Sequence, residues 1–371
     1  MPPSPYIIVI PEIVAFGGAE RSAVALSGWL QRHAMPHRLV TYYDTIGLEK
    51  YAGHPVEMVR LEPKRTPFHK IAALRNFFRA ASGGPKPLMS GIQAALHASA
   101  AGLRGFHTLM HDTPSLLSDG GTAPGLRGWL RRKATDAIIG WGLRSGGCTI
   151  VTSEYLKREC EQLYGGHVEI ARMGGLFSTA AFRPRTVDAE LRMLSVSRVE
   201  ANKRIDWVLR ALAALEREGF FRGRTWRLDV VGTGTQAGAL ADMSRALGIA
   251  EHVAFHGFVG DRQLAELYER THLFLMPAVQ GYGIPTIEAL YRGIPVLLHR
   301  DSGVSDILME TPWCVVARGV EENFKAALAE SIERLLAKRH VNAPLPAIPS
   351  EDDWAARVAL LCGWTAPPAR S

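Results

Sequence analysis

Residues 277–296 read P-A-V-Q-G-Y-G-I-P-T-I-E-A-L-Y-R-G-I-P-V and join the end of one predicted strand to a glycine-rich loop, a helix and a further strand. The apolar run Leu273–Met276 precedes this stretch, and Pro295–His299 is predicted as the next strand. The loop glycines let the backbone approach a ligand closely. Pro285 suits the first helical position, so unpaired N–H groups are expected there, facing an anion. Glu288 is expected in the first turn of the same helix, as an acceptor for hydroxyl groups.

Outside this stretch, short apolar runs with strand character alternate with helical patterns over the whole chain. In the first half the predicted strands are Tyr6–Ile10, Arg38–Tyr43, Leu88–Ser90, Phe106–Met110, Thr149–Thr152 and Val168–Ala171. In the second half they are Leu191–Ser197, Trp226–Val231, His252–His256, Leu273–Met276, Pro295–His299 and Trp313–Val316. This alternation predicts an α/β protein in which two parallel, doubly wound, Rossmann-like domains face each other, with a ligand cleft between them.

The same pattern predicts where the domains begin and end. Residues 1–185 form a first domain, residues 186–340 a second, and residues 341–371 a proline-rich linker followed by a C-terminal helix that packs back on the body. The proline- and arginine-bearing passage Phe182–Thr186 is expected to connect the two domains. At 371 residues the chain is longer than one hydrophobic core usually supports, which also favours two domains.

The bulk composition is that of a soluble globular protein, with 47% hydrophobic and 21% charged residues. No apolar run approaches the length of a transmembrane helix, and the N-terminal Y-I-I-V-I has the character of a first strand rather than of a cleaved leader. Neither a zinc site nor a disulfide framework is expected from the scattered cysteines Cys148, Cys160, Cys314 and Cys362. These features predict reduced thiols and a cytoplasmic location.

Positive charge is concentrated in the first half of the chain. Residues 1–185 contain 22 Lys and Arg against 13 Asp and Glu, a balance of +9, whereas the whole chain carries +7. One basic segment there has apolar residues at helical spacing, namely Phe68, Ile71, Leu74 and Phe78. A second, Leu126–Lys133, reads L-R-G-W-L-R-R-K.

Basic helices with aromatic residues bind anionic lipid surfaces, so these two segments predict peripheral binding to the inner face of the plasma membrane. The alternative for each segment is a helix that faces the core and has a solvated back. Nucleic acid is not expected as a partner, because no known binding motif accompanies the charge.

Four motifs in the second half carry a family resemblance: S-V-S-R-V-E-A-N-K-R-I-D-W-V-L-R-A-L from Ser195, L-D-V-V-G-T-G from Leu228, V-A-F-H-G-F-V from Val253, and the loop quoted above. The first half adds weaker matches, G-G-A-E-R from Gly17 and V-T-S-E-Y-L-K from Val151. With these motifs in this order, the chain resembles the retaining GT-B glycosyltransferases of glycosyltransferase family 4. The resemblance implies transfer of a hexose from a UDP- or GDP-sugar to a lipid-linked or polysaccharide acceptor in cell-envelope or exopolysaccharide synthesis, with no metal or other cofactor.

The resemblance also implies roles for individual residues. Arg198 and Lys203 match residues that hold the donor diphosphate, and a guanidinium with an ammonium suits two negative charges. Glu288 matches the glutamate that accepts hydrogen bonds from the ribose hydroxyls. The other donor-binding positions that the resemblance implies are Gly17, Gly18, Gly232, Gly257, Phe258, Gln280, Gly281, Tyr282, Gly283, Ile284, Pro285 and Thr286.

Two further positions are implied to face the reacting centre. Gln280 stands where the family has a glutamate; an amide keeps an acceptor and gains donors, but it holds no negative charge and removes no proton. This replacement leaves the identity of the donor sugar open. His111 follows the predicted strand Phe106–Met110, and in the family a histidine here touches the donor sugar or stabilises charge in the transition state. The implied catalytic residues are His111, Gln280, Lys203 and Arg198, while His97, His107 and His256 are expected to be structural.

Two alternatives remain open. Residues 232–237, G-T-G-T-Q-A, fit the G-x-G-x-x-A pattern of a dinucleotide-dependent oxidoreductase. The acidic residue that should end the next strand is missing, because that strand ends in His256 and Gly257 while Glu251 precedes it. The second alternative is a non-catalytic relative that binds a nucleotide-sugar or a glycan without turnover, and Gln280 motivates it.

Overall fold

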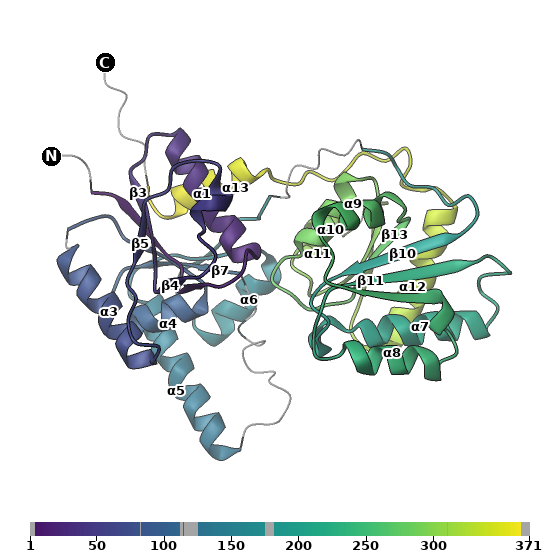
Figure 1. Cartoon of the computed structure of the whole chain (residues 1–371), viewed down its shortest axis with the longest axis horizontal. Coiled ribbons are helices and arrows are strands. Elements are labelled where there is room, and N and C mark those ends of the chain that lie inside the picture. The colour runs from purple at the N-terminus through teal and green to yellow at the C-terminus, as the bar shows by residue number, and fades with distance from the viewer. Residues whose placement is uncertain are drawn as a thin grey trace. The chain divides into compact units, whose positions relative to one another are not determined.

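A computed structural model of the chain describes residues 4–81, 83–111, 114, 125–174, 182–309 and 311–364. The chain divides into two compact units (Figure 1). Unit 1 comprises Met1–Gly174 and Pro349–Ser371, and unit 2 comprises Gly175–Ile348. Each unit is built on a parallel sheet with helices on both faces, which confirms the predicted α/β class with two Rossmann-like halves.

Unit 1 contains a seven-stranded sheet in the order β5-β3-β1-β6-β7-β8-β9, and its neighbouring strands pair in parallel. The chain runs from β1 towards β5 in one direction and from β6 towards β9 in the other, so the strand order reverses between β1 and β6. The strands are β1 (Tyr6–Val9), β3 (His37–Thr41), β5 (Met58–Arg60), β6 (Leu88–Ser90), β7 (His107–Met110), β8 (Thr149–Val151) and β9 (Val168–Ile170). A separate two-stranded ladder joins β2 (Glu12–Ile13) to β4 (Tyr43–Asp44).

The helices of unit 1 cover both faces of its sheet (Figure 1). α1 and α13 lie against each other, and α4 packs against both α3 and α5. Their bounds are α1 (Gly18–Arg32), α2 (Glu49–Ala52), α3 (Pro67–Ala80), α4 (Ile92–Ala100), α5 (Leu126–Leu143), α6 (Glu154–Leu163) and α13 (Glu351–Leu361).

The C-terminal helix α13 belongs to unit 1. Ser350 starts it with a capping box, because its hydroxyl accepts from the Asp353 N–H while the Asp353 carboxylate accepts from the Ser350 N–H. The Trp364 indole donates to the Lys86 carbonyl at 3.3 Å, which fastens the end of this segment to the unit. Gly174 permits the close approach, since a Cβ there would lie 2.2 Å from the Ser350 carbonyl carbon.

Unit 2 contains a six-stranded parallel sheet in the order β12-β11-β10-β13-β14-β15, so its strand order reverses between β10 and β13. The strands are β10 (Leu191–Val196), β11 (Trp226–Val231), β12 (Val253–Gly257), β13 (Leu273–Met276), β14 (Val296–His299) and β15 (Cys314–Ala317). They are largely buried on both faces, which explains why most of them read as short unbroken apolar runs.

The helices of unit 2 are α7 (Ile205–Arg217), α8 (Ala237–Ala246), α9 (Asp261–Glu269), α10 (Ile284–Tyr291), α11 (Ser305–Leu308) and α12 (Glu321–Leu336), with short 3₁₀ turns η2 (Ala201–Lys203) and η3 (Ala250–His252). α7 contacts both α8 and α12 on one face of the sheet, while α10 contacts β13 and β14 from the other face (Figure 1).

The passage predicted to connect the domains is packed within unit 2. The Arg185 guanidinium donates to the Glu269 carbonyl at 2.8 Å, and the Arg185 carbonyl lies 2.7 Å from the His340 imidazole. Phe182 contacts the Trp313 ring at a centroid distance of 5.6 Å. The structural division therefore lies before this passage, at Gly174, rather than at the predicted residue 185.

Candidate functional site

The candidate site of unit 2 lies at the carboxyl ends of β10 and β13. These strands are hydrogen-bonded neighbours, and the strand order reverses between them. In doubly wound sheets such a reversal opens a crevice where ligands bind. The segment after β10 carries Arg198 and Lys203, and the segment after β13 carries Gln280. The Lys203 ammonium donates to the Gln280 amide oxygen at 3.3 Å, so the two segments meet there.

The segment after β10 is joined to the loop after β11. The Val199 N–H donates to the Thr233 carbonyl at 2.9 Å, and the Glu200 carboxylate accepts from the Thr235 hydroxyl at 2.6 Å. These hydrogen bonds from Thr235 hold the pKa of Glu200 below its usual range. Arg198, which lies next to this hydrogen-bonded junction, is exposed.

The glycines of the G-T-G segment are required by this packing. A Cβ at Gly232 would lie 1.8 Å from the Ser197 carbonyl oxygen, and one at Gly234 would lie 2.2 Å from the Val199 oxygen. Gly232 also has a φ of +128°, which side chains disfavour. The pattern that resembles a dinucleotide fingerprint is thus accounted for by contacts between two loops of the same unit.

Gln280 is held between two loops. Its main chain forms a bridge with Ser302, in which the Gln280 N–H donates to the Asp301 carbonyl at 3.2 Å and its carbonyl accepts from the Gly303 N–H at 2.9 Å. Its side-chain NH₂ donates to the Ser302 hydroxyl at 3.3 Å. Ser302 was not among the residues that the sequence predicted for the site.

The helix after this loop begins one residue earlier than predicted. α10 starts at Ile284, so Pro285 occupies the second helical position rather than the first, and Glu288 lies in the second turn rather than the first. The reason is Gly283, whose φ of +125° ends the loop immediately before the helix. Both predicted positions are therefore wrong by one residue, which moves Glu288 just past the first turn.

Glu288 has a partner that the sequence did not predict. The Tyr268 hydroxyl, from the buried end of α9, lies 3.3 Å from both the Glu288 carboxylate and the Pro285 carbonyl. Burial, together with the charge of Glu288, raises the pKa of Tyr268 well above its usual range, so the hydroxyl stays a donor. The Arg292 guanidinium lies over the Tyr268 ring at 4.6 Å.

At the end of β12, Gly257 has a φ of +63° and its carbonyl accepts from the Gly232 N–H at 2.8 Å. Phe258, which follows, is 85% exposed and so presents its ring to solvent beside that junction. The preceding His256 imidazole pairs with the buried Asp229 carboxylate at 2.7 Å, which gives it the structural role that was expected.

The predicted residues of unit 1 lie at the carboxyl edge of its own sheet. Gly17 precedes α1 as its N-cap and Gly18 opens that helix, after the strand end at which the order reverses. His111 follows β7, and its Nε2 lies 3.3 Å from the Ser90 hydroxyl at the end of β6. The structure therefore pairs His111 with Ser90, which sequence patterns did not indicate.

The two basic segments of unit 1 differ in their surroundings. In α3, Leu74 is fully buried and Phe78 packs against the core, so this helix faces inward and only Phe68, at 76% exposure, stands out. In α5, residues 126–134 are all exposed, including Leu126, Trp129 and Leu130. Among the described residues, no helix has both the length and the apolar character needed to cross a membrane.

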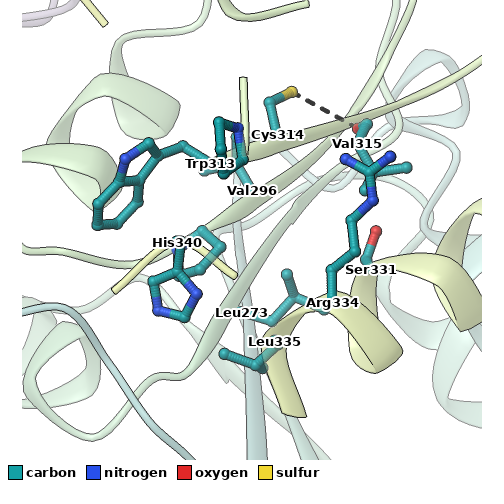
Figure 2. Close-up of a pocket in the computed structure, with 11 residues that line it drawn as sticks. Leu273, Val296, Trp313, Cys314, Val315, Ser331, Arg334, Leu335 and His340 are labelled. Atoms are coloured by element: carbon teal, nitrogen blue, oxygen red, sulfur yellow. Dashed lines mark hydrogen bonds between the residues drawn. The ribbon is translucent and has the colours of Figure 1, made fainter. Parts of the chain in front are cut away.

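A small pocket of unit 2 lies at the opposite edge of the sheet from the candidate site (Figure 2). It opens at the amino ends of β13, β14 and β15 and is closed by Trp313, His340 and the Arg334 side chain of α12. Its free volume of about 10 Å³ is near the minimum for one water molecule. This pocket is therefore too small for a substrate.

The two doubly wound halves define the GT-B fold of glycosyltransferases. Residues 179–348, which include every candidate site residue of unit 2, match the family model described as Glycosyl transferases group 1.

Curated relatives match over part of their length. An uncharacterized glycosyltransferase of Methanocaldococcus jannaschii is 31% identical over 123 residues, which cover 33% of this chain and 30% of that protein. The GDP-mannose-dependent alpha-(1-6)-phosphatidylinositol monomannoside mannosyltransferase of Mycolicibacterium smegmatis is 26% identical over 234 residues, which cover 58% of this chain and 57% of that protein. The chain thus spans less than two thirds of the length of these relatives.

Solved structures match over nearly the whole chain. The lipopolysaccharide outer core galactosyltransferase WaaB has a TM-score of 0.70 at 14% identity, with 96% of this chain and 99% of that chain covered. HepE of Anabaena, in complex with UDP and glucose, has a TM-score of 0.67 at 14% identity, with 97% of this chain and 100% of that chain covered. At these identities the likeness shows the fold.

Proposed function

We propose that this protein is a retaining hexosyltransferase of glycosyltransferase family 4. It transfers a hexose from a UDP- or GDP-sugar to a lipid-linked or polysaccharide acceptor in the synthesis of cell-envelope glycans or exopolysaccharide. The observation that carries this proposal is the meeting of Lys203 and Gln280 at the reversal of strand order in unit 2. The family match over residues 179–348 and relatives named as mannosyltransferases support a glycosyltransferase.

In this proposal the cations after β10 bind the donor diphosphate. Arg198 is exposed at the strand end and Lys203 is half-buried beside the opposite loop, so both can reach the same anion. A hydrogen bond to a charged group contributes about 1.5–3 kcal/mol, which is enough to dominate recognition of a pyrophosphate. HepE, a structural neighbour, binds UDP-glucose, which favours the same class of ligand here.

Glu288 accepts hydrogen bonds from the ribose hydroxyls, and Tyr268 fixes its carboxylate from behind. Gly257 and Phe258 contact the base. Gln280 and the segment Gly281–Thr286 hold the transferred sugar and its phosphates. In unit 1, His111, Gly17 and Gly18 are proposed to contact the donor.

The reaction needs no carboxylate base among these residues. The bond from the sugar to the diphosphate breaks, the acceptor oxygen bonds to the same carbon on the same face, and the leaving phosphate takes the acceptor proton. Lys203 and Arg198 stabilise the negative charge that develops on the leaving group. No metal ion or other cofactor is expected in this mechanism.

A ligand screen tests the proposal. UDP or GDP should raise the thermal unfolding temperature, because a ligand that binds only the native state stabilises it by about 2.7 kcal/mol at a hundred times its Kd. NAD should leave that temperature unchanged. A shift with NAD and none with either nucleoside diphosphate would refute the proposal and favour an oxidoreductase.

A non-catalytic relative is the second candidate, because Gln280 replaces an ionisable residue. Hydrolysis of UDP- and GDP-sugars, measured with and without a lipid acceptor, separates the two. If the protein binds the nucleotide-sugar but releases no nucleoside diphosphate under either condition, a non-catalytic binding protein is favoured.

We also propose that unit 1 binds an anionic membrane surface through the first turns of α5. Leu126, Trp129 and Leu130 are exposed there, and the same turns contain Arg127, Arg131, Arg132 and Lys133 without any acidic residue. Each cation adds about 1 kcal/mol near an anionic surface, and the apolar side chains add burial at the interface.

Sedimentation with lipid vesicles tests this surface. Phosphatidylcholine vesicles that contain phosphatidylglycerol should retain the protein, and vesicles of phosphatidylcholine alone should not. Leu130→Ser should weaken retention, whereas Leu360→Ser, at a leucine of α13 that is even more exposed, should not. Equal loss in both variants would exclude α5 as the binding surface.

A further inference from the structure

The amide of Gln280 has a fixed orientation that follows from its two partners. The Lys203 ammonium can only donate, so the amide atom at 3.3 Å from it must be the carbonyl oxygen. The NH₂ therefore faces the Ser302 hydroxyl, also at 3.3 Å. Ser302 in turn donates its one hydroxyl proton to the Tyr282 carbonyl at 3.3 Å. These contacts form a one-way chain of donors from Lys203 through Gln280 and Ser302 to the backbone.

The surrounding backbone holds this chain in place. Ser302 is 1% exposed, so water cannot replace its partners. A Cβ at Gly283 would lie 2.6 Å from the Gln280 amide nitrogen, so only a glycine leaves room for the side chain in this position. Gly303 likewise allows the two loops to touch, since a Cβ there would lie 1.8 Å from the Gly281 carbonyl oxygen. The Val304 N–H donates to the Tyr282 carbonyl at 3.2 Å and closes the junction.

We infer that Ser302 is a positioning residue for the donor site, which acts through Gln280 to hold the Lys203 ammonium. This series of hydrogen bonds requires an amide at position 280. The inference rests on the proposed nucleotide-sugar site. A carboxylate at 280 has no proton to give Ser302, so it and the Tyr282 carbonyl compete for one hydroxyl proton. A carboxylate at 280 also pairs with the Lys203 ammonium and competes for it with the diphosphate. The neutral amide orients Lys203 and leaves its charge available.

A double-mutant cycle tests the coupling, with the Kd of UDP and GDP measured by isothermal titration calorimetry on the full chain. Ser302→Ala and Gln280→Ala should each weaken binding of the nucleoside diphosphate about five- to tenfold, the effect of about one hydrogen bond. The double variant should bind no more weakly than Gln280→Ala alone, because Ser302 acts only through that side chain. A structural role for Ser302 predicts instead the same loss in both backgrounds.

Gln280→Glu supplies a second test, which addresses the requirement for an amide directly. At pH 8 this variant should bind UDP or GDP at least tenfold more weakly than the wild type. The ordinary pKa of a glutamate carboxyl lies below 5 and the neighbouring Lys203 ammonium lowers it further, so the carboxylate stays ionised and the ratio of the two Kd values should change little between pH 8 and pH 5. Wild-type affinity for UDP or GDP in a folded Gln280→Glu chain would contradict the requirement for an amide.

These outcomes separate the hydrogen-bond chain from Lys203 through Gln280 to Ser302 from the donor site itself. If the wild type binds the nucleoside diphosphate and Ser302→Ala costs the same affinity in the wild type and in Gln280→Ala, only the role of the hydrogen-bond chain is overturned. A wild-type protein that binds neither UDP nor GDP overturns both the proposed site and the role of the hydrogen-bond chain. Near-ultraviolet circular dichroism of each variant shows whether it is folded, and a folded Ser302→Ala chain with wild-type affinity also contradicts the inference.

Discussion

Replacement of Lys203 by methionine tests the proposed diphosphate site with the least disturbance of the fold. Lys203→Met keeps an unbranched apolar stem and removes only the ammonium, which donates to Gln280 at 3.3 Å. The Gln280 side chain is partly exposed, so water can replace the lost donor and the stability of the unit should change little.

The expected loss of affinity follows from the charge. One hydrogen bond between an ammonium and a phosphate contributes about 1.5–3 kcal/mol, which corresponds to roughly a tenfold to a hundredfold increase in the Kd of the donor. Part of that energy is expressed in the transition state, so kcat should fall as well. The remaining affinity should also depend less on salt, because one fewer charge is involved.

The assay is calorimetric titration with UDP and GDP, followed by transfer kinetics once the donor is known. Lys325→Met is the matched control, because Lys325 lies on α12 and donates to the exposed carboxylate of Glu218 at 2.6 Å. The control should bind as the wild type does. Wild-type affinity in Lys203→Met, or an equal loss in both variants, would refute the assignment of Lys203.

Three further predictions address the support of the site and the stability of the two units. Tyr268→Phe removes the hydroxyl beside Glu288 and should raise the donor KM about five- to tenfold with little change in kcat, since it affects ribose binding in both ground and transition states; unchanged steady-state constants would contradict that role. Gly232→Ala places a Cβ 1.8 Å from the Ser197 oxygen and should lower the free energy of unfolding by about 3 kcal/mol or more. Gly238→Ala, in an open helical position, should leave it unchanged or raise it. Similar unfolding temperatures for the two variants would exclude the packing explanation for Gly232. Burial lowers the pKa of His107 from 6.5 to about 4, so between these pH values the native state keeps the imidazole neutral while the unfolded chain takes up a proton. The free energy of unfolding therefore decreases as the pH falls from 6.5 towards 4. His107→Asn keeps an acceptor for the Cys148 N–H, and its free energy of unfolding should fall between pH 7 and pH 5 by about 2 kcal/mol less than that of the wild type, as measured by denaturation curves. An equal fall in both proteins would show that His107 does not cause the pH dependence.

The strands could be predicted closely where apolar runs are bounded by glycine, proline or charge. Leu88–Ser90, Trp226–Val231 and Leu273–Met276 were predicted with the bounds that the structure shows, because each is buried on both sides. The strand β5 was missed, since Met58–Arg60 lies at a sheet edge, is only partly buried and has no apolar pattern of its own. The start of α10 relative to Glu288 depended on the conformation of Gly283, which a sequence does not specify.

The site was predictable only as far as strand ends carry characteristic residues. Lys203 and Gln280 could be assigned from motifs, but their contact depends on the pairing of β10 with β13. Ser302 and Tyr268 reach the site from other loops and helices, more than fifteen positions from the residues they hold. No local pattern marks such residues, because their roles depend on tertiary packing.

A crystal structure of the protein soaked with UDP- and GDP-sugars would show whether the Lys203 ammonium binds the donor pyrophosphate. Pyrophosphate density is expected at the carboxyl ends of β10 and β13, within hydrogen-bonding distance of the Lys203 ammonium. Density for the sugar nucleotide elsewhere in unit 2, away from the Lys203 ammonium, would contradict the assignment of Lys203.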